Sequence, residues 1–245
     1  MAKKTPRKAM LLAAGLGTRL KPVTDTLPKP LIEVDGRALI DHALDRLEAA
    51  GVTDVVVNTH HLADRVEAHL KGRTSPAIRL SPEKELLETG GGIASALTLL
   101  GDGPFFTVNA DAFWLNGPFD ALKRLADTWD DARMDGLLLL HSTVEAYGYT
   151  GRGDFRAGGD GLLERRPETE VSPWLFTGIQ ILHPRLFKDA PKGAFSLNRL
   201  YDQAIEAERL YGAVHDGEWF HVGTPEGLKE AETFMHLRYA GTKRR

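Results

Sequence analysis

The sequence predicts a doubly wound α/β fold, in which a mostly parallel, Rossmann-like sheet carries helices on both faces. The first observation is that short apolar runs alternate with stretches of helical hydrophobic period from residue 8 to residue 141. The second is that two glycine-rich segments and Asp111 directly follow such apolar runs. Because ligands bind at the carboxyl ends of strands in such sheets, we expect these segments to share one site.

The first part of the chain supplies the predicted core of the sheet. Its buried strands carry consecutive apolar residues, such as Val55 to Val57, as in parallel sheets that are covered on both faces. Its helices are marked by apolar residues three and four apart, and Gly51 ends the first of them. We expect strands at 8–13, 54–58, 78–80, 105–108 and 136–141, and helices at 39–50, 62–70, 93–100 and 119–129.

After about residue 142 the pattern changes to short β-like pieces separated by Gly, Asp and Pro, which predict a small mixed-sheet portion closing one side of the site. We expect strands at 153–156, 161–164, 174–182 and 219–222, and helices at 197–209 and 225–239. Thr224 is the expected N-cap of the last helix. The chain 1–245 is therefore expected to be a single domain, with a core at about 8–141 and an added portion at about 142–245.

Composition excludes several classes of function. The net charge of −3 gives no general surface for nucleic acid or membranes, and the absence of Cys excludes disulfides and thiolate chemistry. No apolar stretch reaches the ~20 residues needed to cross a bilayer, and the N-terminus lacks the pattern of a signal peptide. We therefore expect a cytoplasmic protein without a nucleic-acid or membrane partner; the sequence does not predict its oligomeric state.

A glycine-rich loop directly follows the first predicted strand. Small residues at Ala13, Gly15 and Gly17 let the backbone approach a ligand closely, and backbone N–H groups with a helix N-terminus behind them favour an anion. Arg19 and Lys29 add two positive charges, and a proline on each side of Lys29 fixes the chain there. The pattern is neither the Walker nor the dinucleotide motif, so an ordinary glycine turn is the alternative. The loop favours a triphosphate ligand.

A second glycine segment follows at 83–92. Its three consecutive glycines cost folding stability of roughly 0.5–1 kcal/mol each relative to Ala, which suggests that a flat group such as a nucleobase lies against Gly90 and Gly91. Glu83 could accept a hydrogen bond from a base N–H. A flexible turn is the alternative.

Asp111 lies at the end of the segment Asn109-Ala110-Asp111, which directly follows the strand predicted at 105–108. A carboxylate at the carboxyl end of a strand, facing a phosphate loop, is well placed to bind Mg²⁺. A turn-forming or helix-capping aspartate is the alternative.

Residues 147–155 interleave aromatic, glycine and polar residues, a composition that suits a sugar site. Arg152 and Asp154 are its candidate hydrogen-bonding groups, and a glycine-rich hairpin is an equal alternative. Further on, Glu164 stands beside Arg165 and Arg166, which could bind hydroxyls and phosphate or form a solvated face. The sequence leaves open which of the two arginines would contact a phosphate.

The order of these residues resembles a known family. The run LAAGLGTRL at 12–20, followed by PKPL at 28–31, is similar to the signature of the sugar-1-phosphate nucleotidyltransferases. The resemblance extends from residue 10 to about residue 234 and includes WFHVGT at 219–224. It implies that a phosphate oxygen of a sugar 1-phosphate attacks the α-phosphorus of a nucleoside triphosphate, that pyrophosphate leaves, and that Mg²⁺ is the cofactor.

The resemblance also implies roles for individual residues. Arg19 and Lys29 are the implied catalytic residues, with Arg19 on the departing pyrophosphate and Lys29 on the α-phosphate. The implied nucleotide-binding residues are Ala13, Gly15, Gly17, Thr18, Glu83, Gly90 and Gly91. The implied sugar-binding residues are Asn109, Arg152, Asp154, Glu164 and Gly178, and the implied metal ligands are Asp111 and, in the place of a second carboxylate, His221.

Within the family, residues 87–92 and 151–155 resemble the branch that transfers uridylyl from UTP to N-acetylmuramate 1-phosphate in peptidoglycan recycling. A guanylyltransferase for mannose 1-phosphate or a heptose phosphate is the alternative, because Glu83 could pair with guanine or uracil. His221 is a departure from the family, since neutral imidazole is a poorer Mg²⁺ ligand than a carboxylate. We expect the metal to rest on Asp111, phosphates and water; a softer ion or a weakened site are the alternatives. A non-catalytic sensor is disfavoured by the retained charged residues.

Overall fold

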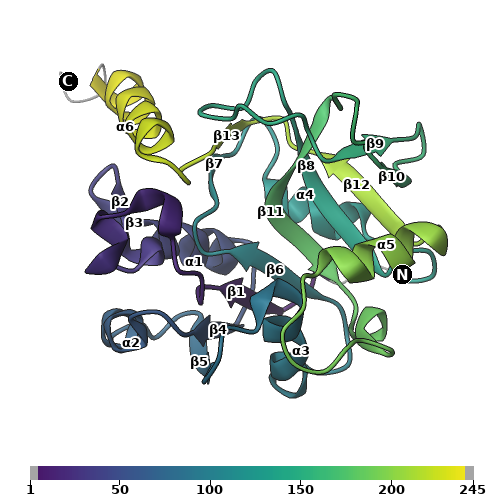
Figure 1. The fold of residues 1–245 in the computed structure, drawn as a ribbon, viewed down its shortest axis with the longest axis horizontal. Coiled ribbons are helices and arrows are strands. Elements are labelled where there is room, and N and C mark those ends of the chain that lie inside the picture. Colours follow the sequence, from purple (N-terminus) through teal and green to yellow (C-terminus); the bar gives the residue numbers. More distant parts are fainter. Residues whose placement is uncertain (1–4, 241–245) are drawn as a thin grey trace.

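The computed structural model describes residues 5–240, and its largest element is a central sheet with helices on both faces (Figure 1). Its strands are β1 (Lys8–Leu12), β4 (Asp54–Thr59), β5 (Ala77–Pro82), β6 (Phe105–Asn109), β8 (Gly136–Ser142), β9 (Phe155–Ala157), β10 (Leu163–Arg165), β11 (Trp174–Leu182) and β12 (Leu210–Val214). They run in the order β10-β9-β11-β6-β1-β4-β5, and β8 joins β11 to β12. The predicted α/β fold is confirmed.

The centre of the sheet is parallel. β1 lies between β4 and β6, with Met10 opposite Val56 on one side and Thr107 on the other, and β5 extends the parallel set beyond β4. The parallel register brings the carboxyl ends of β1, β4 and β6 to one edge, where Leu12 is opposite Asn58 and Asn109. That edge is where the sequence predicts the site.

The later part of the chain joins the same sheet rather than forming a separate one. β11 runs antiparallel to β6 on one side and to β8 on the other, so it occupies a central position. A register shift between Phe176 and Gln180 interrupts its pairing with β8. The short β9 and β10 pair at the edge next to β11, where they make up the small mixed portion.

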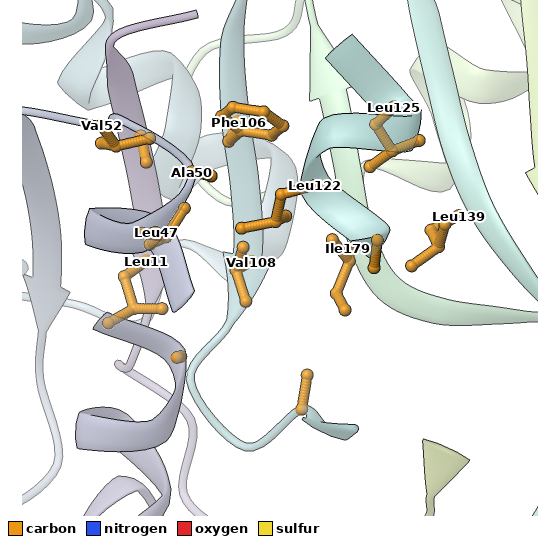
Figure 2. Packing of buried hydrophobic residues seen from close by; sticks show 14 of the residues in the cluster. Leu11, Leu47, Ala50, Val52, Phe106, Val108, Leu122, Leu125, Leu139 and Ile179 are labelled. Carbon is orange, nitrogen blue, oxygen red and sulfur yellow. The ribbon is translucent and has the colours of Figure 1, made fainter. Parts of the chain in front are cut away.

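Helices cover both faces of the sheet because side chains alternate along each strand. The helices are α1 (Leu39–Ala49), α2 (Ala63–Leu70), α3 (Glu88–Leu100), α4 (Ala121–Thr128), α5 (Asn198–Glu206) and α6 (Pro225–Ala240). Leu11 of β1 belongs to a buried cluster with α1, α2 and α4, part of which Figure 2 shows, whereas Met10 belongs to a second cluster with α3 and α5.

A third buried cluster lies beside the site and is built on two small strand pairs, β2 (Glu33–Val34) with β3 (Arg37–Ala38) and β7 (Phe113–Leu115) with β13 (Glu218–Phe220). α6 packs Ala231 and Met235 into this cluster. The expected N-cap of α6 is confirmed, since the Gly227 amide donates to Thr224 Oγ1 at 3.2 Å.

The start of α3 corrects the prediction for the second glycine segment. The helix begins at Glu88 rather than at residue 93, so the three glycines belong to its first turns. A Cβ added at Gly90 would lie 2.3 Å from the Phe195 ring, and one added at Gly91 would lie 2.4 Å from the Gly193 carbonyl oxygen. The glycines therefore allow close packing of the chain, and the assignment of Gly90 and Gly91 to a nucleobase stays a prediction.

The first glycine loop also differs from its prediction. Three short 3-10 turns, Thr18–Leu20, Val23–Asp25 and Lys29–Leu31, follow it instead of a helix N-terminus. The strands β2, β3, β7 and β12 were not predicted, since most of them are too short to show an alternating pattern. No helix of the described part of the chain is long and apolar enough to cross a membrane.

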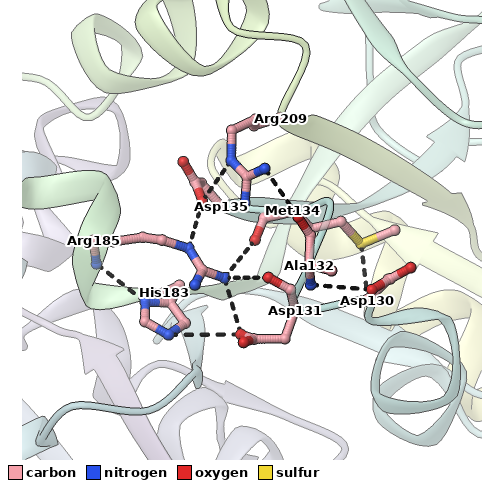
Figure 3. A network of polar contacts seen from close by, with 8 residues as sticks. All are labelled: Asp130, Asp131, Ala132, Met134, Asp135, His183, Arg185 and Arg209. Atoms are coloured by element: carbon pink, nitrogen blue, oxygen red, sulfur yellow. Dashed lines mark hydrogen bonds and ion pairs between the residues drawn. The ribbon is translucent and has the colours of Figure 1, made fainter.

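At the edge of the sheet opposite the glycine loop, an ion-pair network joins the ends of three strands (Figure 3). The Asp135 carboxylate accepts from Arg185 Nε at 2.6 Å and pairs with Arg209 Nε at 2.9 Å. Arg185 also donates to Asp131 at 2.9 Å. Asp135 precedes β8, Arg185 follows β11 and Arg209 precedes β12, so one carboxylate ties the ends of these strands together.

Candidate active site

Three cavities lie at the carboxyl ends of β1 and β6, and two of them meet at Asp111. The first, of about 390 Å³, has an apolar wall that includes Leu12, Pro30 and Leu86. The second, of about 220 Å³, is lined by Arg19, His221 and aromatic side chains. The two cavities share three residues, which are Lys29, Asn109 and Asp111. A ligand in one cavity can therefore meet a ligand in the other at this junction.

A chain of hydrogen bonds holds the floor of the first cavity. The Ala13 amide donates to Asn58 Oδ1 at 2.8 Å, and Asn58 Nδ2 donates to Glu83 Oε1 at 2.7 Å. The other oxygen of Glu83 accepts from the Leu87 amide at 3.0 Å. Glu83 is buried and both of its oxygens have partners within the chain, so the structure uses it as a brace between β1 and α3. Its assignment to a base stays a prediction.

The nucleotide-binding residues predicted in the glycine loop differ in their surroundings. Ala13 and Gly15 line the first cavity, and a Cβ at Gly15 would meet nothing within 4 Å. Gly17 has φ +62° and packs against Thr24 and Lys29, so it shapes the loop. Thr18 is exposed and lines neither cavity.

Gly90 and Gly91, which the sequence analysis also assigned to the nucleotide, do not line the first cavity; their neighbours Glu88 and Thr89 do. The amides of both glycines donate to the Phe195 carbonyl oxygen. The glycines are therefore explained by close packing of α3 against the segment before α5.

The junction of the two cavities is occupied by an ion pair between Lys29 Nζ and Asp111 Oδ2. Lys29 is held in a 3-10 turn by its flanking prolines, and its side chain is only 12% exposed. Asp111 follows β6 and is 34% exposed, so its carboxylate also faces the cavities. The sequence analysis placed both residues at the site, and the structure brings them into contact.

His221 and Arg19 lie at the far side of the second cavity. Arg19 Nη1 donates toward His221 Nε2 at 3.4 Å, so this ring nitrogen acts as an acceptor. Burial lowers the pKa of His221, and the neighbouring cations Arg19 and Lys29 lower it further. The imidazole is therefore neutral near pH 7.

The donor set of this cavity fits a divalent cation that takes most of its ligands from phosphates. Asp111 and His221 both line the cavity, and they supply one carboxylate and one neutral imidazole. Among the described residues, no group of three or more His, Cys, Asp or Glu side chains could hold a metal. Mg²⁺ is commonly bound through one or two carboxylates together with substrate phosphates.

The residues predicted to bind sugar fall into two groups. Asn109 and Gly178 line the second cavity, and Gly178 (φ +83°) leaves room for Asn109, whose Nδ2 would lie 2.7 Å from an added Cβ. Arg152, Asp154 and Glu164 line neither cavity. Asp154 Oδ2 accepts from the Phe176 amide at 2.8 Å, which anchors its loop to β11.

Both arginines that follow Glu164 have partners within the chain. Arg165 donates to Asp202 at 2.6 Å and stacks on Phe155, with 4.9 Å from its guanidinium carbon to the ring centroid. Arg166 donates to the carbonyl oxygens of Gly153 and Glu170 at 2.9 and 2.7 Å. The structure therefore gives each of them a local role.

Sequence reasoning missed the aromatic wall of the second cavity, which Tyr149, Phe176 and Trp219 form. Trp219 Nε1 donates to the Thr177 carbonyl oxygen at 3.0 Å, which fixes the ring against β11. The three residues come from distant segments and share no spacing. The mixture of residues at 147–155 and the resemblance at 219–224 included two of them, but the sequence analysis assigned neither of these a role in the site.

Comparisons with known proteins agree over nearly the whole chain. A family model described as nucleotidyl transferase matches residues 8–237. The N-acetylmuramate alpha-1-phosphate uridylyltransferase of Caulobacter vibrioides is 45% identical over 93% of this chain and 96% of its own length. Its counterpart from Neisseria meningitidis is 37% identical over 92% and 96%.

More distant proteins share the fold or part of the length. The mannose-1-phosphate guanyltransferase of Aspergillus fumigatus is 33% identical, but this chain covers only 61% of it. A UDP-glucose pyrophosphorylase solved with UDP-glucose superposes with a TM-score of 0.74 at 20% identity, over 95% of this chain and 99% of that one. HddC from Yersinia pseudotuberculosis, complexed with GMP-PN, gives 0.73 at 22% identity, over 93% and 99%.

Proposed function

The chain belongs to the nucleotidyl transferase family, and we propose that it transfers uridylyl from UTP to N-acetylmuramate 1-phosphate, releasing pyrophosphate. The choice of donor and acceptor is supported by the two relatives that carry this activity in their names and match 93% and 92% of the chain. The observation that carries the proposal is the pair of cavities that meet at Lys29, Asn109 and Asp111, because a transfer between two substrates needs two sites with one junction.

The chemistry follows from the charges at this junction. A phosphate oxygen of the sugar 1-phosphate forms a bond to the α-phosphorus, and the bond from that phosphorus to the pyrophosphate oxygen breaks. The reaction needs no nucleophile from the protein, because positioning and neutralisation of charge lower the barrier. Lys29 reaches the α-phosphate from the junction, and Arg19, on the 3-10 turn that follows the glycine loop, neutralises the departing pyrophosphate.

The nucleoside occupies the first cavity, where Leu12, Pro30 and Leu86 provide an apolar wall for base and ribose. The acceptor occupies the second, where Asn109 and Gly178 face its hydroxyls. Asp111, with His221 beside it, would hold Mg²⁺, which supplies further neutralisation of the phosphates when bound.

The proposed substrates also suggest a cellular role. N-acetylmuramate is a sugar of the bacterial cell wall, and its 1-phosphate would arise from a kinase acting on the released sugar. We therefore place the reaction in peptidoglycan recycling in the cytoplasm, where nucleoside triphosphates are made.

The test is release of pyrophosphate from UTP, GTP and dTTP, each combined with the 1-phosphates of N-acetylmuramate, N-acetylglucosamine and mannose. We expect the highest kcat/KM for UTP with N-acetylmuramate 1-phosphate. A preference for GTP with mannose 1-phosphate or a heptose phosphate would replace this proposal with a guanylyltransferase. Absence of pyrophosphate release with every pair would point to a sensor instead.

A further inference from the structure

The turn at 151–153 is held by hydrogen bonds on every side. The Gly153 amide donates to the Tyr149 hydroxyl at 3.1 Å, and the Gly153 carbonyl oxygen accepts from Arg166 Nε at 2.9 Å. The Arg152 carbonyl oxygen accepts from the Ser172 amide at 2.8 Å. A surface turn rarely has this many fixed points, so its backbone is preorganised.

The residue that this turn presents is Arg152. Its side chain is exposed, and within residues 5–240 no hydrogen bond or ion pair to its guanidinium is found. The neighbouring arginines differ, because Arg156 pairs with Glu170, Arg165 with Asp202 and Arg166 with backbone carbonyls. A free guanidinium can bind a carboxylate in two parallel hydrogen bonds, and the fixed backbone removes the entropic cost of ordering the turn.

Tyr149 connects this turn to the second cavity. It lines that cavity, and its ring meets Trp219 and His221 edge-on, with centroids 6.2 and 6.3 Å apart. A Cβ at Gly151 would lie 2.3 Å from the Tyr149 hydroxyl, so the glycine lets the turn close onto the tyrosine. Burial raises the pKa of Tyr149, as does the charge of Asp154. The hydroxyl therefore keeps its proton while it accepts from Gly153.

We propose that Tyr149 is a positioning residue for acceptor specificity: it holds the 151–153 turn beside the second cavity, so that Arg152, which does not line the cavity itself, binds from outside it a carboxylate carried by the sugar. The acceptor class is a sugar 1-phosphate with a second, carboxylate-bearing substituent. This inference rests on the proposed function, since it assumes that the second cavity binds the acceptor. It adds a residue that gives an acidic acceptor a lower KM than its neutral analogue.

The test compares Tyr149→Phe with Tyr147→Phe, a matched control. Tyr147 stacks on Phe220 two residues away and donates nothing to the turn. Steady-state rates are measured with the 1-phosphates of N-acetylmuramate and N-acetylglucosamine, which differ in the lactyl carboxylate. For Tyr149→Phe we expect the ratio of kcat/KM for the muramate to kcat/KM for the glucosamine to fall about tenfold, because only the muramate uses Arg152. Tyr147→Phe should match the wild type.

Arg152→Met and the double variant complete the test. Arg152→Met should remove the preference for the carboxylate-bearing acceptor, Arg152→Lys should restore part of it, and adding Tyr149→Phe to Arg152→Met should cause no further loss. Melting temperatures verify that each variant is folded.

Three results would overturn the inference. If Tyr149→Phe changed both acceptors equally, or if its effect added to that of Arg152→Met, Tyr149 would not act through Arg152. If Arg152→Met removed the preference and Tyr149→Phe kept it, only the role of Tyr149 would fail. If the wild type did not prefer the muramate at all, the proposed acceptor would fail, and the inference with it.

Discussion

The contact between Lys29 and Asp111 sets the conditions under which a cation can bind. The Lys29 ammonium occupies the position beside Asp111 Oδ2 that a divalent ion would need, and both side chains are partly shielded from water. Phosphates that enter the junction give Lys29 other partners, which releases the carboxylate. Cation and nucleotide should therefore assist each other, whereas cation and lysine compete in the free protein.

Replacing Lys29 with methionine should separate these two effects. Turnover should fall by about 100-fold or more, because a charge that stabilises the transferring phosphate is lost. Binding of Mn²⁺ to the free protein should tighten, since the ammonium no longer competes for Asp111. The unbound Mn²⁺ signal in electron paramagnetic resonance measures the second effect, with Lys71→Met as an exposed control. Unchanged or weaker Mn²⁺ binding in Lys29→Met would contradict the competition.

At the scale of one helix, the glycines of α3 show how packing overrides propensity. Gly in a helix costs about 1 kcal/mol relative to Ala, and α3 carries three of them in its first turns. Each lies where a Cβ would meet another part of the chain, and for Gly92 that part is Glu83 Oε1, at 2.7 Å. The glycines allow α3 to approach the segment before α5 and the brace formed by Asn58 and Glu83.

Gly91→Ala therefore tests whether packing or propensity decides. An added Cβ would lie 2.4 Å from the Gly193 carbonyl oxygen, so we expect a loss of about 1–3 kcal/mol in the free energy of unfolding, as for overpacked sites. Thr98→Ala, at an exposed position of the same helix, should instead be neutral or slightly stabilising. Urea unfolding measures both, and a stabilised Gly91→Ala would show that the backbone yields easily.

The segment between β12 and β13 contains a buried histidine that links stability to pH. Burial lowers the pKa of His215 from 6.5 to about 4, and the nearby His141 contributes in the same direction. Its Nε2 faces the Leu115 carbonyl oxygen at 3.1 Å, and its Nδ1 is buried without a partner. The neutral ring is thus the form that fits the fold.

The sign of the pH effect follows from this lowered pKa. Between pH 6.5 and about 4 the unfolded chain binds a proton that the folded chain does not, so stability is full above pH 6.5 and falls with decreasing pH. The shift corresponds to at most about 3 kcal/mol. His215→Gln keeps a donor for Leu115 but cannot titrate. Its free energy of unfolding should vary less with pH over this range; a curve parallel to that of the wild type would assign the effect to other groups.

For the molecule as a whole, the sequence predicted the features that depend on residues close together in the chain. Lys29 between two prolines and Asp111 after a strand were predicted as site residues from their neighbours in the sequence, and both line the two cavities. The central position of β11 was not predictable, since the order of strands depends on contacts between distant segments. The proposed role of Tyr149 was not predictable for the same reason, because it depends on the contact of residues 147–149 with β13.

We expect residues at one edge of the sheet to serve catalysis and residues at the opposite edge to serve stability. One substitution at each edge tests this expectation. Asp111→Asn should lower turnover by orders of magnitude while the melting temperature stays close to that of the wild type, because Asp111 is partly exposed and, in the proposed reaction, serves the phosphates. Asp135→Asn should cost about 2 kcal/mol in the free energy of unfolding, because Arg185 and Arg209 lose the carboxylate they share. Its kcat and KM should stay unchanged, because the network lies far from the site along β6. Leu182, beside the network, pairs with Phe105, the first residue of β6, whereas the site lies at Asn109, the last. Pyrophosphate-release kinetics and thermal unfolding of both variants measure the two effects. Loss of activity in folded Asp135→Asn would mean that the ends of β8, β11 and β12 control the geometry at Asp111.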